Sequence, residues 1–469
     1  MNREKNLFKN TIIITIGKLS TQLITFFLLP LYTGILSTSE YGIVDFLNTL
    51  VSLSLPLITF QVEQAVFREL IEKRNDEKEK RIIISSGLYT IVINVLIFTL
   101  LFVLIAPFVK NDYKYFLLGN VIINIFLSLF LQISRGLGEN KKYAIGSFIS
   151  ALSTIIFNIL FVAIFKFGAY GMLLGTFIGQ LIASIYIFFN LKLIKYINFR
   201  SHKKVVIKKL LNYSIPLIPN AISWWIFNAS DRVIVTGLLG TEKNGILAAS
   251  LKFSAVYANL YGFFNMSWTE SISMAINDCD IEKFFNKMFN IVMRLFISIA
   301  IGIIAVMPFA YPLLINEKFS EGYYLVPISI IASIFNVVVG LISVIYVGNK
   351  NTKAIANTSI VSAIINIIIH LSLIRFLGLY AAVISTFSSF FIMSIYRIHD
   401  INKKYIKIKI DKRIIIYSII VLAIVLYSYY NNVLAYKIIS LGLSIVFALL
   451  INMNSIKTIF EMLKKKIKR

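Results

Sequence analysis

Seven ionisable side chains lie inside long apolar segments of this 469-residue chain. A lysine, arginine or aspartate at the centre of a membrane helix costs roughly 2.5–3.5 kcal/mol on insertion scales, so such residues usually have a function. All seven fall in the first two apolar segments of either half of the chain, which predicts that they act together. They are Lys18, Asp45, Glu63, Asp231, Arg232, Lys252 and Glu270.

The three cations of this set are expected at intermediate depth. Arg232 lies nine residues before Thr241 and Lys252 lies nine residues after Lys243. At about 1.5 Å per residue, both are roughly 13 Å from the turn at 240–243, and Lys18 is about 12 Å from the opposite surface. Lysine holds a diphosphate as a point charge, and arginine can grip it with two N–H donors. We therefore predict that these three cations bind an anionic substrate.

Ion pairing is the alternative role for the same residues. Asp231 is adjacent to Arg232, and Asp45 could reach a cation on a later helix. A pair that holds two helices together needs no substrate. Glu63 and Glu270 are expected near the cytoplasmic ends of their helices, where an interfacial carboxylate is commoner than a proton relay. All four acids are therefore candidates for either coupling or pairing, with Asp45 the better relay.

The composition predicts the elements that must position these residues. Apolar residues make up 58% of the chain and charged residues 15%, which is too few for a soluble surface. The apolar residues form blocks of the roughly 20 residues that span a bilayer, and lipid requires such blocks to be helices. We expect an all-α integral membrane protein with about fourteen spans, at 11–36, 41–67, 82–108, 115–134, 143–165, 169–190, 213–237, 244–274, 290–315, 322–347, 354–374, 378–396, 414–430 and 434–452.

The positions of the basic residues predict the orientation of this multi-pass chain. Segments on one side, which include 397–413, hold 37 of the 47 lysine and arginine residues, and the segments on the other side hold 7. The positive-inside rule then makes both termini cytoplasmic. Because the charges are dispersed among loops, the net charge of +25 does not indicate nucleic acid. The basic tail at 464–469 fits attraction to anionic membrane lipids.

Two sequence matches predict an internal repeat. TGILSTSEYGI begins at Thr33 and TGLLGTEKNGI at Thr236, which is 203 residues later. GAYGMLLGTF at Gly168 matches GLYAAVISTF at Gly378, with an offset of 210. The offset covers six spans, so the two repeats face the same way, and repeat transporters place substrate between their halves. The predicted parts are a six-helix bundle at 1–190, a basic cytoplasmic linker at 191–212, a second six-helix bundle at 213–400, and two extra helices with a basic tail at 401–469.

Enzyme chemistry has little support in the sequence. A single cysteine, Cys279, excludes an internal disulfide, and three separated histidines make a metal site unlikely to form. The sequence contains no phosphate-binding glycine loop and no nucleophile motif. We therefore expect neither a cofactor nor a metal nor an enzymatic activity.

At these segments the chain resembles the Wzx-type polysaccharide flippases of the exporter superfamily that also contains the multidrug (MATE) transporters. The resemblance rests on FLLPLYTGILSTSEYG at 27–42, SIPLIP at 214–219 and ASDRVIVTGLLGTEKNGIL at 229–247, and it covers the whole chain. It implies translocation of an undecaprenyl-diphosphate-linked oligosaccharide across a bacterial inner membrane by alternating access. It further implies a cationic central cavity and a monomer that is driven by an ion gradient, of H⁺ or Na⁺, or by the membrane potential rather than by ATP. Polymerase and glycosyltransferases of an O-antigen or capsule pathway are the expected associates.

Three other functions remain open from the sequence. A multidrug antiporter of the same superfamily tends to carry an acid on the first helix, whereas this chain has Lys18 there. A peptidoglycan-precursor flippase shares the cationic cavity and the helix number. A membrane-bound polysaccharide polymerase needs reactive groups near one face, often on a long outer loop, and the outer loops here are short.

Overall fold

The computed structural model describes residues 26, 28–198, 202–431, 433–454 and 456–457, and every regular element in this part of the chain is a helix. Eleven of these helices are long and apolar enough to cross a membrane, and they occupy eleven of the predicted span positions. The spans expected at 213–237 and 244–274 are helices that carry more polar residues. The first expected span lies mostly outside the described residues, so the number fourteen stays a prediction.

The chain forms two compact units that divide between Gly245 and Ile246. The first contains α2 (Leu29–Ile35), α3 (Thr38–Thr59), α4 (Val62–Glu72), α5 (Glu77–Ile105), α6 (Lys114–Gly136), α7 (Asn140–Asn158), α8 (Gly168–Asn190), α9 (Lys204–Ser214) and α10 (Ile218–Leu239). Helix α11 (Thr241–Ala275) starts in this unit. The second contains α12 (Ile281–Leu314), the 3₁₀ segment η6 (Glu317–Leu325), α13 (Val326–Gly348), α14 (Thr352–Leu377), α15 (Tyr380–Lys404), α16 (Lys412–Tyr430) and α17 (Leu434–Ile451).

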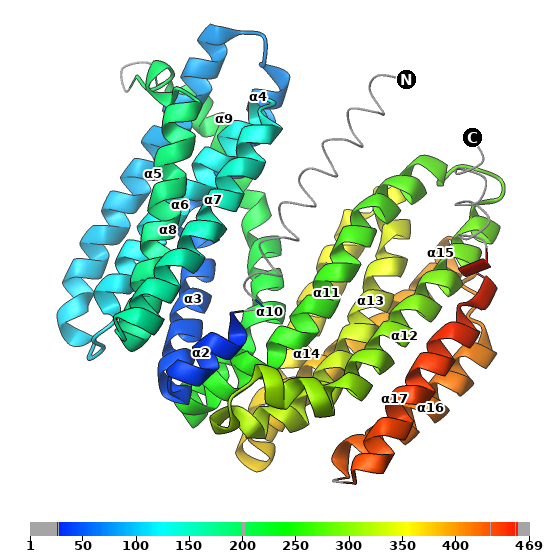
Figure 1. Cartoon of the computed structure of the whole chain (residues 1–469). Helices are drawn as coiled ribbons and strands as arrows, with labels where there is room; N and C mark the ends of the chain where they lie inside the picture. The colour runs from blue at the N-terminus through cyan, green and yellow to red at the C-terminus, as the bar shows by residue number, and fades with distance from the viewer. Residues whose placement is uncertain (1–25, 27, 199–201, 432, 455, 458–469) are drawn as a thin grey trace, which may run out of the picture. The chain divides into compact units, whose positions relative to one another are not determined.

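In the first unit, α8 packs closely on α7 (Figure 1). Glycines spaced four residues apart on α8 make this contact. A Cβ added to Gly171 would lie 2.9 Å from the Phe161 carbonyl oxygen, and one added to Gly179 would lie 2.5 Å from the Thr154 nitrogen. Lipid supplies little hydrophobic force between helices, so close backbone approach at small residues stabilises the packing instead. The other helices surround α6, which contacts α3, α4, α7 and α8.

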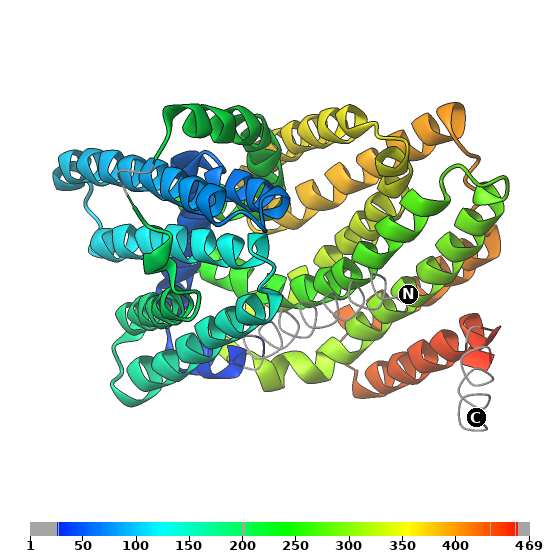
Figure 2. The ribbon, with the colours of Figure 1, turned by 90° about the horizontal axis from the view of Figure 1, so that it is seen from above.

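In the second unit, α15 packs against both α13 and α14. The hairpin of α16 and α17 packs on α12, and two perpendicular views show α17 in red beside the green α12 (Figures 1 and 2). The predicted extra pair of helices therefore has a definite docking partner inside its own unit. The predicted domain boundaries at 190, 212 and 400 stay predictions.

The span expected at 41–67 is interrupted. Helix α3 ends at Thr59 and α4 begins at Val62, and the two residues between them, Phe60 and Gln61, have φ values of 52° and 59°. Two successive left-handed residues cannot continue a right-handed helix, so the chain changes direction there. The linker expected at 191–212 likewise contains most of α9, whose amphipathic sequence packs on α4 and α5.

The repeated segments begin their helices at equivalent positions, with different local conformations. Ser37 caps α3 in a capping box, in which its Oγ accepts from the Glu40 amide at 3.1 Å and Glu40 accepts from the Ser37 amide at 2.9 Å. Gly240 takes the equivalent place before α11 with a φ of 91°, which favours glycine. The second pair of matched segments opens on Gly168 and Gly378, whose φ values are 57° and 53°.

Two repeat-related glycines make a reciprocal close contact. A Cβ on Gly42 would lie 1.8 Å from the Thr241 carbonyl oxygen, and a Cβ on Gly245 would lie 1.9 Å from the Thr38 carbonyl oxygen. Gly42 and Gly245 occupy equivalent positions in the two repeats, and so do Thr38 and Thr241. The contact is therefore symmetric: each glycine meets the threonine of the other repeat. The Ser39 and Thr241 hydroxyl oxygens lie 2.7 Å apart beside this crossing. Only glycine fits at either position.

We predict that Gly42→Ala destabilises the protein by roughly 1–3 kcal/mol, because a methyl group must displace backbone atoms. Thermal unfolding of the purified protein in detergent would show this as a lower Tm. Gly237→Ala is the matched control, since no atom lies within 4 Å of its added Cβ. Equal melting temperatures for Gly42→Ala and the wild type would contradict the packing described here.

Candidate functional site

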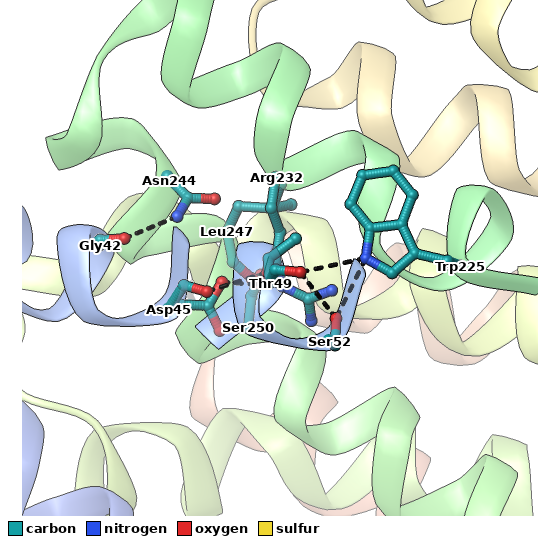
Figure 3. Close-up of polar contacts among 9 residues, drawn as sticks. All are labelled: Gly42, Asp45, Thr49, Ser52, Trp225, Arg232, Asn244, Leu247 and Ser250. Atoms are coloured by element: carbon teal, nitrogen blue, oxygen red, sulfur yellow. Dashed lines mark hydrogen bonds and ion pairs between the residues drawn. The ribbon is translucent and has the colours of Figure 1, made fainter. Parts of the chain in front are cut away.

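The centre of the candidate site is an ion pair between α3 and α10. Arg232 Nε lies 2.8 Å from Asp45 Oδ2, and the two side chains are 19% and 14% exposed (Figure 3). Asp45 is two turns into α3, and Arg232 is two turns before the end of α10. The two helices pack against each other, so residues 187 positions apart in the sequence become partners.

Polar contacts beside the ion pair join α3 to α10 and to α11. Trp225 Nε1 donates to the Thr49 carbonyl oxygen at 3.1 Å and to Ser52 Oγ at 3.0 Å (Figure 3). Asn244 Nδ2 donates to the Gly42 carbonyl oxygen at 2.8 Å. The indole N–H is therefore used to position α10 on α3. These bonds hold Arg232 and Asp45 in a defined geometry rather than leaving two flexible side chains.

The other predicted residues have different surroundings. Asp231 is buried in the first unit, at 8% exposure. In the second unit Lys252 is half-buried and Glu270 is exposed, both on α11. Lys18 lies outside the described residues. The structure thus places Arg232 with Asp45 in one site, and the joint substrate-binding role of Lys18, Arg232 and Lys252 stays a prediction.

Glu63 is the most deeply buried acid of the predicted set. Its side chain is on the first turn of α4, directly after the break, and the residue is 1% exposed. Within the described chain, both of its carboxylate oxygens are buried without a hydrogen-bond partner. The neighbouring acids of α4 are paired elsewhere, Glu72 with Arg68 at 3.0 Å and Glu69 with Lys209 at 2.5 Å. Glu63 is therefore a buried carboxyl group directly after the break, and its role in coupling or pairing stays a prediction.

Arg397 was wrongly placed in a cytoplasmic loop by the sequence analysis. It lies on α15, which continues to Lys404, and is 2% exposed. Its Nε donates to Thr358 Oγ1 at 2.9 Å, and its Nη atoms donate to Ser343 Oγ at 2.5 Å and Ser359 Oγ at 3.0 Å. None of its partners is a carboxylate. The guanidinium instead uses hydroxyl groups to connect α13, α14 and α15.

A periodic signal in the sequence could have located Arg397. The buried residues Ser385, Ser389, Met393, Arg397 and Ile401 recur every four positions on α15. Residues four apart lie on one face of a helix, so Arg397 continues a buried face rather than starting a loop. The count of charged residues alone does not reveal this buried position, because an arginine that follows an apolar segment ordinarily marks the cytoplasmic end of that segment.

The profile of the family described as polysaccharide biosynthesis protein matches residues 7–275, which include Asp45, Glu63 and Arg232. This match covers more than half of the chain. The chain belongs to the polysaccharide biosynthesis protein family. No curated protein matches it.

Solved transporters share the fold of this polysaccharide biosynthesis protein. Lipid II flippase MurJ, in an inward closed conformation, is 19% identical with a TM-score of 0.71 over 96% of this chain and 100% of that one. A multidrug resistance MATE family transporter of the MOP superfamily, in an inward-facing conformation, is 14% identical with a TM-score of 0.63 over 83% and 98%. The predicted fold class is confirmed: this family member is a multi-pass membrane protein with the fold of these transporters.

We predict that Asp45 and Arg232 stabilise the protein as a coupled pair. Asp45→Asn or Arg232→Gln leaves one partly buried charge uncompensated, so each should lower the Tm, and the double variant should lose less than the sum. A double-mutant cycle of unfolding free energies should give a coupling of about 1–3 kcal/mol.

The pair Arg68–Glu72 is the control for this cycle, because its side chains are 51% and 50% exposed. Removing that pair should change stability by less than about 1 kcal/mol. Additive effects at Asp45 and Arg232 would show that the two charges are not coupled.

Proposed function

We propose that the protein is a flippase that moves an undecaprenyl-diphosphate-linked oligosaccharide repeat unit from the inner to the outer leaflet of a bacterial membrane, for surface polysaccharide synthesis. Family membership supports a role in polysaccharide biosynthesis. The fold is that of transporters, one of which is a flippase of lipid II. Polymerase and glycosyltransferases of the same pathway are the expected associates of a monomeric protein.

The observation that carries this proposal is the accessible, intramembrane arginine of the α3–α10 ion pair. Arg397, by contrast, is 2% exposed and its guanidinium donates to three hydroxyl groups of neighbouring helices. Arg232 instead keeps 19% of its side chain exposed. A planar guanidinium matches the geometry of a diphosphate, to which it can donate two parallel hydrogen bonds. The site therefore suits the diphosphate group of a lipid-linked sugar.

Exchange of Asp45 for the substrate diphosphate at Arg232 can couple binding to a change of conformation. With no substrate, Asp45 neutralises Arg232 and keeps α3 and α10 together. A diphosphate carries more negative charge than one carboxylate and competes for the same guanidinium. When it binds, Asp45 loses its partner and the contact between α3 and α10 weakens, which favours another helix arrangement. Substrate binding is thereby coupled to alternating access through a single charge.

We predict that Arg232→Gln reduces export of lipid-linked repeat units at least tenfold in cells that depend on this protein for a surface polysaccharide. The double variant Asp45→Asn/Arg232→Gln is the decisive test, because it removes both charges of the pair together and should fold. Export is measured as the fraction of lipid-linked units open to a membrane-impermeant oxidant of sugars.

In this assay the stably folded double variant should still fail to export. Wild-type export by that variant would show that Arg232 is a helix-pairing residue with no substrate, and would refute the proposed binding site. The exposed pair variant Arg68→Gln/Glu72→Gln controls for expression and for general charge effects.

We further propose that Glu63 binds the proton that drives transport. An ionised carboxylate without a partner is expensive in a low-dielectric interior, so Glu63 is most stable when protonated. To release the proton it needs water or a cation, which a rearrangement at the break between α3 and α4 would supply. Phe60 and Gln61 provide that break in the same turn of the chain.

We predict that Glu63→Gln, which mimics the protonated acid, folds like the wild type but no longer responds to a pH gradient. Transport into proteoliposomes is measured with and without an imposed gradient, and proton uptake is followed with an entrapped dye. Glu72→Gln, on the solvent-exposed end of the same helix, should respond normally. Transport that follows a sodium gradient at constant pH would exclude the proton and assign the driving ion to Na⁺.

A further inference from the structure

A cavity of about 530 Å³ lies within the second unit, and none of the ionisable residues discussed above lines it. It is formed where α12 ends, along η6, and beside the first turn of α17, and its volume falls in the range of small-molecule sites, about 300–1,000 Å³. The groups that matter for binding are Glu317, Ser320, Tyr323, Tyr324 and Lys437. We call this cavity the tyrosine pocket.

The wall of the tyrosine pocket is held in place by reciprocal bonds. Tyr323 Oη donates to the Tyr429 carbonyl oxygen at 3.1 Å, and Tyr429 Oη donates to the Tyr323 carbonyl oxygen at 2.7 Å. Their rings stack with centroids 4.2 Å apart. Tyr430 Oη donates to the Tyr324 carbonyl oxygen at 3.2 Å, and these two rings are also parallel. The wall is therefore preorganised, which lowers the entropic cost of binding.

These hydroxyl contacts set the tyrosines apart from an ordinary aromatic belt. Tyrosines at a membrane surface usually direct their hydroxyl groups to lipid headgroups. Here the hydroxyl groups of Tyr323, Tyr429 and Tyr430 are used to join η6 to α16. The ring of Tyr324 nevertheless remains 43% exposed at the edge of the cavity. It is a fixed aromatic face with room for a ligand.

The charged groups of the tyrosine pocket balance each other. Glu317 supplies a carboxylate and Lys437 an ammonium group, and neither side chain has an ion pair with any described residue. Ser320 adds an exposed hydroxyl group. A phosphate ligand would be repelled by the carboxylate, whereas a polyhydroxylated neutral ligand can donate to Glu317 and accept from Lys437.

We propose that the tyrosine pocket binds a neutral sugar residue of the glycan. A pyranose ring presents apolar C–H groups on its faces and hydroxyl groups on its rim, which match an aromatic face flanked by a carboxylate and an ammonium group. Under the predicted orientation the pocket opens at the outer face, where the sugar part of the product arrives. This assignment rests on the proposed function, whose substrate carries such sugars.

Saturation-transfer NMR on the full-length protein tests the proposal, in a detergent without a sugar headgroup. The probes are glucose, galactose, N-acetylglucosamine, N-acetylgalactosamine and rhamnose, each titrated separately. At least one should give a saturable signal with the wild type, and Tyr324→Ala and Glu317→Gln should each weaken its apparent affinity about tenfold. The control is Tyr115→Ala, which removes a tyrosine that is 65% exposed in the first unit.

The outcomes separate this site from the flippase proposal. If no sugar binds, or if Tyr324→Ala binds as well as the wild type, the tyrosine pocket is not a sugar site, whatever the export assay shows. If export proves independent of Arg232 while a sugar still binds through Tyr324 and Glu317, the flippase site is refuted and the sugar site stands. Equal losses in Tyr115→Ala would reveal a non-specific effect and overturn the assignment.

Discussion

The cost of placing an unpartnered charge in a low-dielectric interior organises this structure. In the described chain, helix packing supplies partners for Asp45, Arg232 and Arg397. Asp45 on α3 neutralises Arg232 on α10 at 2.8 Å. Arg397 on α15 instead donates to hydroxyl groups of α13 and α14. The need to compensate a buried charge is thus met in two ways. A competing anion can replace Asp45 in the ion pair, whereas it cannot replace the neutral hydroxyl groups around Arg397 in the same manner.

Glu63 stands out because it breaks this rule. Both of its oxygens are buried without a hydrogen bond in the described chain, at the point where α3 stops and α4 begins. Sites where one local rule is broken while all neighbours obey theirs are usually functional. The backbone supports this view, since two consecutive left-handed residues at Phe60 and Gln61 are also unfavourable for side chains other than glycine. An unfavourable charge and an unfavourable backbone lie within one turn of each other.

Close backbone approach positions these groups. Gly42 meets Thr241, and Gly245 meets Thr38, at distances that exclude any side chain. This contact lies one turn from Asp45, so it determines where the acid is presented. On α8 the glycines spaced four residues apart have the same effect against α7. Small residues therefore stabilise helix packing in lipid, as large apolar residues stabilise the core of a soluble protein. They allow backbones to approach closely, and lipid tails cannot make that contact.

The sequence by itself determined the helical class and the positions of most spans. Each of these depends on composition or on periodicity over one or two turns, which neighbouring residues alone decide. The tertiary structure decided which partner each charge takes. Asp45 could have paired with any of several cations, and only the packing of α3 on α10 selected Arg232. Arg397 is buried where two neighbouring helices supply hydroxyl groups, and the wall of the tyrosine pocket forms where η6 packs on α16. Such partnerships join residues far apart in the chain, so no local pattern encodes them.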